Sequence, residues 1–443
     1  MLKFRWETEF KETEFGEIPK DWEIKRLDEV VRFIKGVSYS SAEINSNGEG
    51  ELFITLNNFL RGGGFKKEEF KYYTGDKARE EQRVRNGDLI IALTDMTNEA
   101  RVVGAPAIVS IPHNYDYGII SLDCAKAVPI NNISKSYLCA YLIMSQEENA
   151  TFANGVNVLH LNLDLFIKHK LIPYPPPPEQ SRIATVLSWF DDLIENKKKQ
   201  NEILEKTAMA IFKNWFIDFE PFKDGEFVES ELGRIPKGWE VKAVGDVAEI
   251  MRGISFDSED ASFEHFEGAI PILRANNIKQ DRTIDLTDLM FISKSKVPEE
   301  KKLKELDIVI VGSNGNPDLV GNFACFIEGL YLTDFSFGSF MYCLRTNNKI
   351  LFPFIYCTLN STYFAEYLAA VVTGTNISNL KKSDLETFSI IFPPSTILQK
   401  FHSLVEPLFQ KIINNQKEIM VLKKIRDTLL PLLVFGKLRV EEL

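Results

Sequence analysis

IPKDWE at residues 18–23 returns 217 residues later as IPKGWE at residues 235–240. Around it, residues 13–39 (TEFGEIPKDWEIKRLDEVVRFIKGVSY) align without a gap with residues 230–256 (SELGRIPKGWEVKAVGDVAEIMRGISF), and 11 of the 27 positions are identical. The chain therefore contains one unit of about 220 residues twice, because this period is far longer than the roughly 20–50 residues of a solenoid repeat.

The two copies continue to match downstream of this opening. LNN at residues 56–58 matches ANN at 275–277, GDLIIAL from Gly87 matches LDIVIVG from Leu306, GVNVLHL at 155–161 matches GTNISNL at 374–380, and Gln180 lies opposite Gln399. Short β-type runs such as DLIIAL, APAIVSI, DIVIVG and FACFI are broken by Gly, Asn and Pro, and helical stretches such as KSYLCAYLIMSQ intervene. This mixture predicts an α/β or α+β globular domain in each copy.

Composition and charge limit what these domains do. A chain of 443 residues is too long to fold around one hydrophobic core, so we expect two domains or more. Its content of 44% hydrophobic and 26% charged residues is typical of a soluble globular protein. No apolar run reaches the roughly 18 residues of a membrane span, and the charged N-terminus lacks a signal-peptide core. The five cysteines form no C-x-x-C pair, so we expect a cytoplasmic protein without a zinc site. With a net charge of −11, any DNA-binding surface must be local.

A long helix with a heptad pattern is predicted at the end of each copy. The 4-3 spacing is kept by Ile183, Leu187, Phe190, Ile194, Lys197, Asn201, Leu204, Ala208, Ile211 and Trp215, and again by Phe401, Val405, Leu408, Ile412, Asn415, Ile419, Leu422, Arg426, Leu429 and Leu433. Such a seam over four to five heptads predicts coiled-coil packing. We expect the pairing of the helices to rest on Ile183, Leu187, Phe190, Ile194, Leu204, Ile211, Val405, Leu408, Ile412, Ile419, Leu422 and Leu429.

Two features of these helices leave alternatives open. The polar seam positions Lys197, Asn201, Asn415 and Arg426 either fix the register of the pair or simply interrupt an ordinary long helix. The proline run at residues 173–178 predicts a stiff extended connector into a first helix over residues 180–216, because proline joins neither a helix interior nor a central strand. A ligand for a proline-binding domain is the less favoured interpretation of the same run.

The resulting domain organisation is globule, helix, globule, helix. We expect globular domains at residues 1–174 and 223–393, a connector and first long helix at 175–222, and a second long helix at 394–443. If the helices pair antiparallel, the two similar globules are held apart and related by a pseudo-twofold axis. Two similar binding domains held at a fixed separation would suit a target that consists of two separate parts.

With this organisation, the chain resembles the specificity (S) subunit of type I restriction-modification systems. The likeness rests on GEIPKDWE and GRIPKGWE at the start of the copies, PPPPEQSRIATVL at the entry to the first helix, and LLPLLVFGKLRV near the end. It implies two target-recognition domains that each read half of a bipartite site in double-stranded DNA, with helices that set the spacing. It also implies docking of two methyltransferase (M) subunits and of restriction (R) subunits, so S-adenosylmethionine, ATP and Mg are expected on those partners and no cofactor on this chain. The second copy departs from the pattern with PPSTILQK from Pro393, which puts docking residues at that corner in doubt.

No catalytic constellation is expected. The strings YPPPP and FPPS lack the leading amide or acid and the trailing aromatic of an adenine-methyltransferase loop, and neither a phosphate-binding loop nor a metal-binding histidine pair occurs. Glu23-Ile24-Lys25 and Glu240-Val241-Lys242 match a nuclease pattern but favour a solvated strand edge. A methyltransferase or nuclease with an unfamiliar site, and a coiled-coil scaffold that never touches DNA, remain the alternatives to a non-catalytic DNA-specificity subunit.

Candidate DNA contacts occupy matching places in the two copies. Arg and Lys read guanine or bind phosphates, and Asn reads adenine. In the first copy, two asparagines are followed by cations interleaved with aromatic residues and then by a polar loop. The candidate contacts in this stretch are Asn57, Asn58, Arg61, Lys66, Lys67, Arg79, Arg83, Arg85, Thr94, Asn98 and Arg101. The second copy gives Arg274, Asn276, Asn277, Lys279, Arg282, Lys294, Lys296, Ser313, Asn314 and Asn316. Because the chain is acidic, we expect it to bind DNA weakly without its partners.

Overall fold

The protein folds into two compact units. The computed structural model describes residues 2–6, 8–96, 99–286, 288–328, 334–346, 348–372 and 378–442. The first unit comprises Met1–Ile194 together with Leu422–Leu443, and the second comprises Glu195–Val421. Both ends of the chain therefore belong to the first unit, where β1 (Leu2–Arg5) pairs antiparallel with β32 (Arg439–Glu442).

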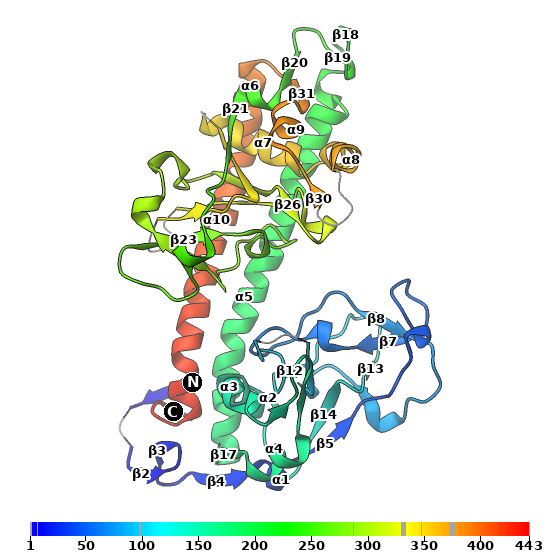
Figure 1. The fold of residues 1–443 in the computed structure, drawn as a ribbon. Coiled ribbons are helices and arrows are strands. Elements are labelled where there is room, and N and C mark those ends of the chain that lie inside the picture. Colours follow the sequence, from blue (N-terminus) through cyan, green and yellow to red (C-terminus); the bar gives the residue numbers. More distant parts are fainter. Residues whose placement is uncertain are drawn as a thin grey trace. The chain divides into compact units, whose positions relative to one another are not determined.

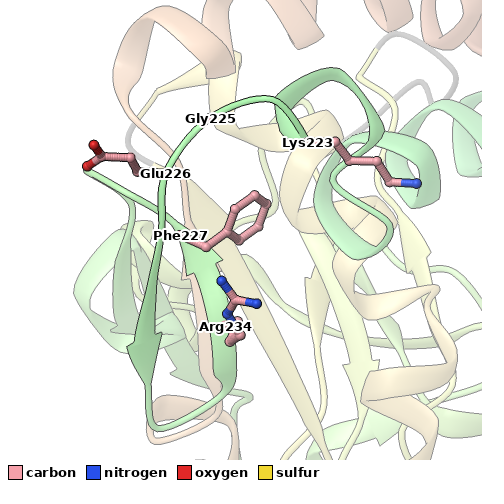
Figure 2. A pocket seen from close by; sticks show the side chains of 5 residues that line it. All are labelled: Lys223, Gly225, Glu226, Phe227 and Arg234. Atoms are coloured by element: carbon pink, nitrogen blue, oxygen red, sulfur yellow. The ribbon is translucent and has the colours of Figure 1, made fainter.

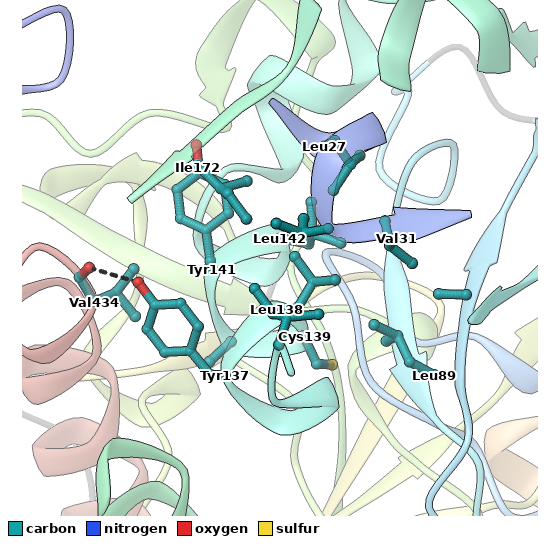
Figure 3. Packing of buried hydrophobic residues seen from close by; sticks show 14 of the residues in the cluster. Leu27, Val31, Leu89, Tyr137, Leu138, Cys139, Tyr141, Leu142, Ile172 and Val434 are labelled. Atoms are coloured by element: carbon teal, nitrogen blue, oxygen red, sulfur yellow. Dashed lines mark hydrogen bonds between the residues drawn. The ribbon is translucent and has the colours of Figure 1, made fainter. Parts of the chain in front are cut away.

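The core of the first unit is a four-stranded antiparallel sheet in the order β12-β10-β14-β5 (Figure 1). Its strands are β5 (Val31–Lys35), β10 (Leu89–Ala92), β12 (Pro106–Ile108) and β14 (Cys124–Pro129). All four residues of β10 are buried, as expected of a central strand with an unbroken apolar run. The apolar helix α2 (Lys135–Met144) packs on this sheet, and Figure 3 shows its Leu138 and Leu142 beside Leu89 and Val31. The predicted runs DLIIAL, APAIVSI and KSYLCAYLIMSQ are thus confirmed as strand, strand and helix.

Smaller sheets and helices complete the first unit. A five-stranded sheet runs in the order β6-β8-β7-β13-β9, β11 pairs with β16 and β16 with β15, β17 pairs with β4, and β2 pairs with β3. The remaining elements are β2 (Phe10–Thr13), β3 (Gly16–Pro19), β4 (Glu23–Arg26), β6 (Ile44–Asn45), β7 (Glu51–Ile54), β8 (Lys71–Tyr73), β9 (Arg83–Val84), β11 (Thr94–Asp95), β13 (Gly118–Ile120), β15 (Ala153–Asn154), β16 (Leu159–Leu161), β17 (Leu171–Tyr174), α1 (Leu27–Val30), α3 (Gln146–Ala150) and α4 (Leu163–His169).

The second unit repeats this topology. Its sheets run β21-β29-β25-β27 and β22-β24-β23-β28, β26 pairs with β30, β20 with β31, and β18 with β19. The elements are β18 (Phe227–Ser230), β19 (Gly233–Pro236), β20 (Glu240–Ala243), β21 (Ala248–Arg252), β22 (Ala261–Ser262), β23 (Ala269–Leu273), β24 (Met290–Ser293), β25 (Ile308–Val311), β26 (Ser313–Asn314), β27 (Phe323–Cys325), β28 (Ser336–Phe337), β29 (Met341–Thr346), β30 (Ser378–Asn379), β31 (Ser389–Phe392), α6 (Val244–Val247), α7 (Phe352–Leu359), α8 (Thr362–Val371) and α9 (Lys382–Glu386). The predicted duplication is therefore confirmed, although β9 and β15 of the first unit have no counterpart among the described strands of the second.

Two long helices, α5 (Pro177–Phe212) and α10 (Ser395–Val434), confirm the predicted heptad helices. α5 begins three residues before the predicted start, since Pro177 and Pro178 lie in its first turn. The prediction that the proline run stays an extended connector is therefore wrong at its C-terminal end. A helix tolerates proline in its first turn, where backbone N–H groups have no intrahelical acceptor. At its other end α5 continues into a π-helical turn at Lys213–Ile217.

Bonds within each unit show that α5 and α10 run antiparallel there. In the second unit Asn201 accepts a hydrogen bond of 2.8 Å from Asn415, and further along α5 the ring centroid of Phe212 lies 6.2 Å from that of Phe401, which is nearer the start of α10. In the first unit Asp191 accepts a hydrogen bond of 2.7 Å from Arg426, and Glu179 near the start of α5 accepts one from Arg439, which follows the end of α10. Every position of the two predicted seams is buried or half-buried. Which of these side chains hold the helices together stays a prediction.

A buried polar group lies between the helices of the second unit. The Asn415 side chain is fully buried and donates to Asn201 and, at 3.3 Å, to Gln200. Its Oδ1 accepts from the Lys197 ammonium at 3.4 Å, and Lys197 also forms an ion pair with Glu418. Because these polar side chains bond one another across the two helices, they favour the interpretation that they fix the register.

The repeated IPK-x-WE openings anchor each unit to a long helix. Trp22 is fully buried and its Nε1 donates to Glu179 of α5 at 3.1 Å. Glu179 in turn accepts from Arg439, which also reaches Asp21 at 2.9 Å. The turn that ends α10 supports this corner, because Gly436 has a φ of 67° and a Cβ there would collide with Pro19.

The equivalent corner of the second unit is aromatic. Leu398 replaces Glu179 in the alignment, and the ring centroid of Trp239 lies 5.8 Å from that of Phe216, 5.6 Å from Phe219 and 5.0 Å from Phe222. The departure PPSTILQK is thus matched by a different local core. Trp22 and Trp239 of the repeated openings therefore both pack beside a long helix, with different partners.

None of the helices formed by the described residues is long and apolar enough to cross a membrane.

Candidate nucleic-acid interface

The predicted cations of the first unit are largely neutralised by neighbouring carboxylates. Arg61 pairs with Glu99 at 2.9 Å, Lys66 with Glu69 at 2.7 Å, Arg79 with Glu81 at 3.2 Å, Arg83 with Glu80 at 2.6 Å, and Arg85 with Glu80 at 3.6 Å. Lys67 is exposed, and the Arg83 guanidinium also lies over the Tyr117 ring at 4.4 Å. The segment at residues 59–85 therefore carries much less free positive charge than its composition indicates.

The predicted cations of the second unit are also paired. Lys279 meets Asp285 at 2.9 Å, Lys294 meets Asp334 at 2.9 Å, and Lys296 pairs with Asp260. Arg282 lies over the Phe323 ring at 4.1 Å, 3.7 Å from a carboxylate oxygen of Glu205 in α5, and bonds Asn360. Arg282 thus ties its loop to α5, a structural role that its sequence neighbourhood does not indicate.

Asn58 and Asn277, at equivalent positions, are not available to DNA, which corrects two predicted contacts. Asn58 is fully buried, and its side chain accepts from the Thr55 backbone at 3.0 Å and donates to the carbonyls of Lys66 and Glu68. Asn277 does the same with the Arg274 amide at 2.9 Å and the Asp285 carbonyl at 3.0 Å. The last asparagine of the matching LNN and ANN strings is therefore a buried side chain that holds its own loop together by hydrogen bonds to the backbone.

Their neighbours remain on the surface. Asn57 and Asn276 are exposed. The half-buried Arg274 donates to the Asp288 carbonyl at 2.7 Å, and its guanidinium lies 5.0 Å from the Phe263 ring. Arg101 is half-buried, and Asn98 lies outside the described residues.

The predicted polar loops begin at two equivalent β-ribbons. Thr94 of β11 is opposite His160 of β16, and Ser313 of β26 is opposite Asn379 of β30. Thr94 is buried and its hydroxyl donates to Asp123 at 3.0 Å, so the predicted DNA contact of Thr94 is also corrected. The Ser313 hydroxyl donates to Asn379 at 2.5 Å. These ribbons bring together residues about 66 positions apart, including His160 and Asn379, which the sequence analysis did not select.

Two exposed cations in equivalent places were also missed. Lys35 ends β5 and Arg252 ends β21, and neither forms an ion pair with a carboxylate of the described residues. The signal was present in the repeat itself, because KGVSY and RGISF keep a cation before an invariant Gly at this point of the alignment.

The described residues offer no group of three or more His, Cys, Asp or Glu side chains placed to hold a metal ion. Burial raises the pKa of the Cys124 and Cys139 thiols to about 12, so neither is a thiolate nucleophile near neutral pH. Glu23-Ile24-Lys25 and Glu240-Val241-Lys242 lie in β4 and β20, strands of two-stranded sheets, where Lys25 pairs with Glu23 at 3.2 Å and Lys242 with Glu240 at 3.1 Å.

A surface hollow of about 600 Å³ lies beside the β18–β19 hairpin (Figure 2). It is lined by Lys223, Gly225, Glu226, Phe227 and Arg234. Lys223 pairs with Glu220 at 2.6 Å, and the Arg234 guanidinium lies 5.7 Å from the centroid of the Phe227 ring. This lining contains no Ser, Thr, Cys or His side chain.

Comparison with known proteins agrees with the duplicated topology. The model of the type I restriction modification DNA specificity domain matches residues 19–206 and again residues 236–424. The chain belongs to this family. Its two matched segments are two target-recognition domains, and it is a specificity subunit, a class that carries no catalytic activity of its own.

Relatives match over the whole length of this specificity subunit. The type I restriction enzyme MjaIX specificity subunit of Methanocaldococcus jannaschii is 39% identical over 456 residues, which cover 100% of this chain and 99% of the relative. The MjaVIII specificity subunit of the same organism is 27% identical with the same coverage. A crystal structure of the type I restriction-modification S subunit from M. genitalium matches with a TM-score of 0.49 and 18% identity, covering 93% of this chain and 96% of that one.

Proposed function

We propose that each of the two recognition domains reads one short word of a bipartite double-stranded DNA target. The single observation that carries this proposal is the repeated fold with different polar side chains at equivalent ribbons. His160, opposite Thr94, occupies the position that Asn379, opposite Ser313, occupies in the second unit. Equal folds with unequal side chains are what two different words require, because hydrogen-bonding groups at base edges carry sequence information.

Mapping of modified adenines tests this function. The genome of the host is compared with that of a strain from which the gene has been deleted. We expect the intact strain to carry modified adenines in a motif of two short words around a fixed gap, and the deletion strain to lose that motif. An identical pattern in both strains contradicts the proposal and favours a scaffold that does not touch DNA.

We further propose the division of labour that the family resemblance implies. Recognition domains at residues 1–174 and 223–393 read DNA, while the segments at 175–222 and 394–443, which contain α5 and α10, set the spacing and dock two M subunits, with R subunits joining the assembly. S-adenosylmethionine, ATP and Mg bind to those partners. The DNA target and the five free cysteines support a cytoplasmic location.

Exposed apolar side chains on the long helices support docking there. Trp189 and Leu193 of α5 and Ile425 of α10 are exposed in the first unit, as are Ile203, Leu404 and Val421 in the second. On α5 the spacing of Trp189 and Leu193 places them on one face, beside the seam but outside it. Large apolar groups on one face of a helix are typical of a surface that a protein partner covers.

The chain alone is expected to bind a duplex with its target on the order of 100-fold more weakly than the chain with its M subunits, because most of the predicted DNA-binding cations form ion pairs and the net charge is −11. Trp189→Glu combined with Leu193→Glu is expected to remove this gain and to abolish co-purification with the M subunit. Affinity is measured by fluorescence anisotropy at physiological salt.

The matched control is Trp6→Glu combined with Ile130→Glu, two exposed apolar side chains of the same unit that lie off the long helices. This control should co-purify and bind DNA as the unaltered chain does. Tight and sequence-specific binding by the chain alone contradicts the weak-binding expectation, and equal loss in both double variants contradicts docking at α5.

A further inference from the structure

We propose that each recognition domain contacts its DNA word through one repeated surface, which we call the turn site. In the first unit the turn site consists of Lys35, the turn at residues 122–123 and His160. In the second unit it consists of Arg252, the turn at residues 339–340, Asn314 and Asn379. The inference rests on the proposed function and specifies which residues read the words.

Backbone bonds hold the parts of each turn site together. In the first unit the Gly36 amide donates to the Cys124 carbonyl at 3.0 Å, and the Leu122 amide donates to the Val37 carbonyl at 2.9 Å. In the second unit the Gly253 amide donates to the Met341 carbonyl at 3.0 Å, and the Arg252 Nε donates to the Ser339 carbonyl at 3.1 Å. The cation that ends β5 or β21 is therefore fixed beside the turn.

The glycine after each cation is required by this close approach. A Cβ at Gly36 would collide with the carbonyl oxygens of Ile120 and Ser121, and a Cβ at Gly253 would collide with those of Phe337 and Gly338. The repeated KG and RG pairs thus place a cation at the same point of both domains for a geometric reason.

The same turn supports the ribbon that carries the polar side chains. The Leu93 amide donates to the Asp123 carbonyl at 2.7 Å, and the Leu161 amide donates to the Leu93 carbonyl at 2.7 Å. Correspondingly, the Gly312 amide donates to the Phe340 carbonyl at 2.8 Å, and the Leu380 amide donates to the Gly312 carbonyl at 2.8 Å. The cation, turn and ribbon form one continuous hydrogen-bonded surface in each unit.

The cations of the turn site differ from the other candidates in their electrostatics. Lys35 and Arg252 are exposed and meet no carboxylate of the described residues, whereas Arg79, Lys279 and Lys294 are each held by one. A cation without a carboxylate partner at the same place in both domains is suited to bind a DNA phosphate, because the phosphate backbone is common to every DNA sequence.

In the second unit, asparagine amides are presented for reading bases. The Oδ1 of Asn379 accepts from the Ser313 hydroxyl, and the Oδ1 of Asn314 accepts from the Asn316 amide at 2.8 Å. Neither Nδ2 donates to any group within the described ranges. These fixed NH₂ groups match the acceptors of the major groove, such as the N7 of adenine and guanine.

An exposed aromatic ring lies beside these amides. Phe340 is 61% exposed although it sits in a turn that is locked by two backbone bonds, from Gly312 at 2.8 Å and from Ser313 at 3.1 Å. A rigid, exposed ring is suited to contact a thymine methyl group or a base edge. In the first unit the matching turn carries the exposed Leu122 and the carboxylate of Asp123. The cation that both domains share therefore predicts the same contact with the DNA phosphate backbone. The different side chains beside it predict that the two domains read different words.

The first test replaces Asn379 by aspartate in the full chain, in the host, with its partner subunits present. The exchange is isosteric and keeps the Oδ1 that Ser313 bonds, but it turns the NH₂ donor into an acceptor. Phe340→Ala is made in parallel. Modified adenines are then mapped. We expect degeneracy or a changed base at one or two positions of one word, with the other word and the gap unchanged.

Matched controls in the same unit but outside the turn site are Asn348→Asp and Phe263→Ala. Asn348 is exposed and its Oδ1 accepts a hydrogen bond of 3.0 Å from the Ile350 amide, which aspartate keeps, and Phe263 is 62% exposed. Both controls should leave the motif unchanged. An unchanged motif in Asn379→Asp and Phe340→Ala overturns the turn site while the two-word function stands. Absence of any bipartite motif with the unaltered chain overturns the proposed function itself.

A second measurement tests the cation. In the assembled complex with its M subunits, Arg252→Gln should weaken binding to all target sequences alike. It should also reduce the slope of log Kd against log salt concentration by about one, as the loss of one phosphate contact does. Lys294→Gln, an ion-paired lysine of the same unit, is the control and should leave the slope unchanged. Equal slopes for Arg252→Gln and the unaltered complex contradict the phosphate contact.

Discussion

Replacing Arg439 by methionine is expected to lower the free energy of unfolding of the first unit by about 3–5 kcal/mol, the cost of leaving a buried charge without its partner. The Arg439 side chain is 7% exposed, and its Nε and Nη2 lie 2.5 and 2.6 Å from the two carboxylate oxygens of Glu179, which is equally buried. Without Arg439, the Trp22 Nε1 is the one donor among the described residues that is left to bond that carboxylate. Urea unfolding followed by tryptophan fluorescence measures the effect.

The matched control is Arg5→Met, because Arg5 lies in β1, the strand that pairs with β32. Its ion pair with Glu441 at 3.0 Å is surface-exposed, so its loss should cost no more than about 1 kcal/mol. Equal destabilisation by the two exchanges would show that the strand pairing, and not the buried charges, stabilises this corner.

Acid is expected to weaken the same corner. The hydrogen bond from Arg439 holds the pKa of the Asp21 carboxyl below its ordinary value of 3.8. A carboxylate with a lowered pKa stabilises the fold above its ordinary pKa, and this contribution is lost as the pH falls through the lowered value. Arg439→Met should therefore remove part of the pH dependence of stability below about pH 4.

Inserting four helix-favouring residues after Asn196 in α5 and four after Ile419 in α10 is expected to lengthen the gap between the two DNA words by one or two base pairs. Four residues add about 6 Å to a helix, and one base pair occupies about 3.4 Å. A four-residue insertion in both helices is also the step that coiled coils accommodate by local unwinding. Both words should remain unchanged, as read from the map of modified adenines.

Four residues inserted after Ser46, in the surface loop between β6 and β7, serve as the control and should leave the gap as it is. A gap that stays the same after the helix insertions, with both words still read, would mean that α5 and α10 do not set the spacing. Loss of modification in the control variant would instead point to general damage to the domain.

Much of the fold could be predicted because its signals are local. The apolar run at residues 89–92 became the fully buried strand β10, and the 4-3 spacing from Ile183 became α5. The predicted start of α5 lies three residues too late, because proline does not break a helix in its first turn. The repeat in the sequence does not reveal that Trp22 meets charged side chains while Trp239 meets aromatic rings.

The candidate site was harder to predict because exposure and pairing are not local. Asn58 and Asn57 are neighbours with the same chemistry, yet one is fully buried and the other exposed. Lys294 looks as suitable for DNA as Arg252, and only its approach to Asp334 sets it apart. Counting cations along the chain therefore overestimated the positive charge that is free to meet DNA.

The sequence by itself determined the duplication, the strand and helix types and the heptad seams, because periodicity and glycine or proline positions act over a few residues. Tertiary structure decided which charges are neutralised, which asparagines pin loops, and that Glu179 meets Arg439 from 260 positions away. The physical reason is that burial and ion pairing depend on which distant segments the fold brings within a few ångströms. The spacing of two residues along the chain does not indicate how far apart they lie in the folded protein.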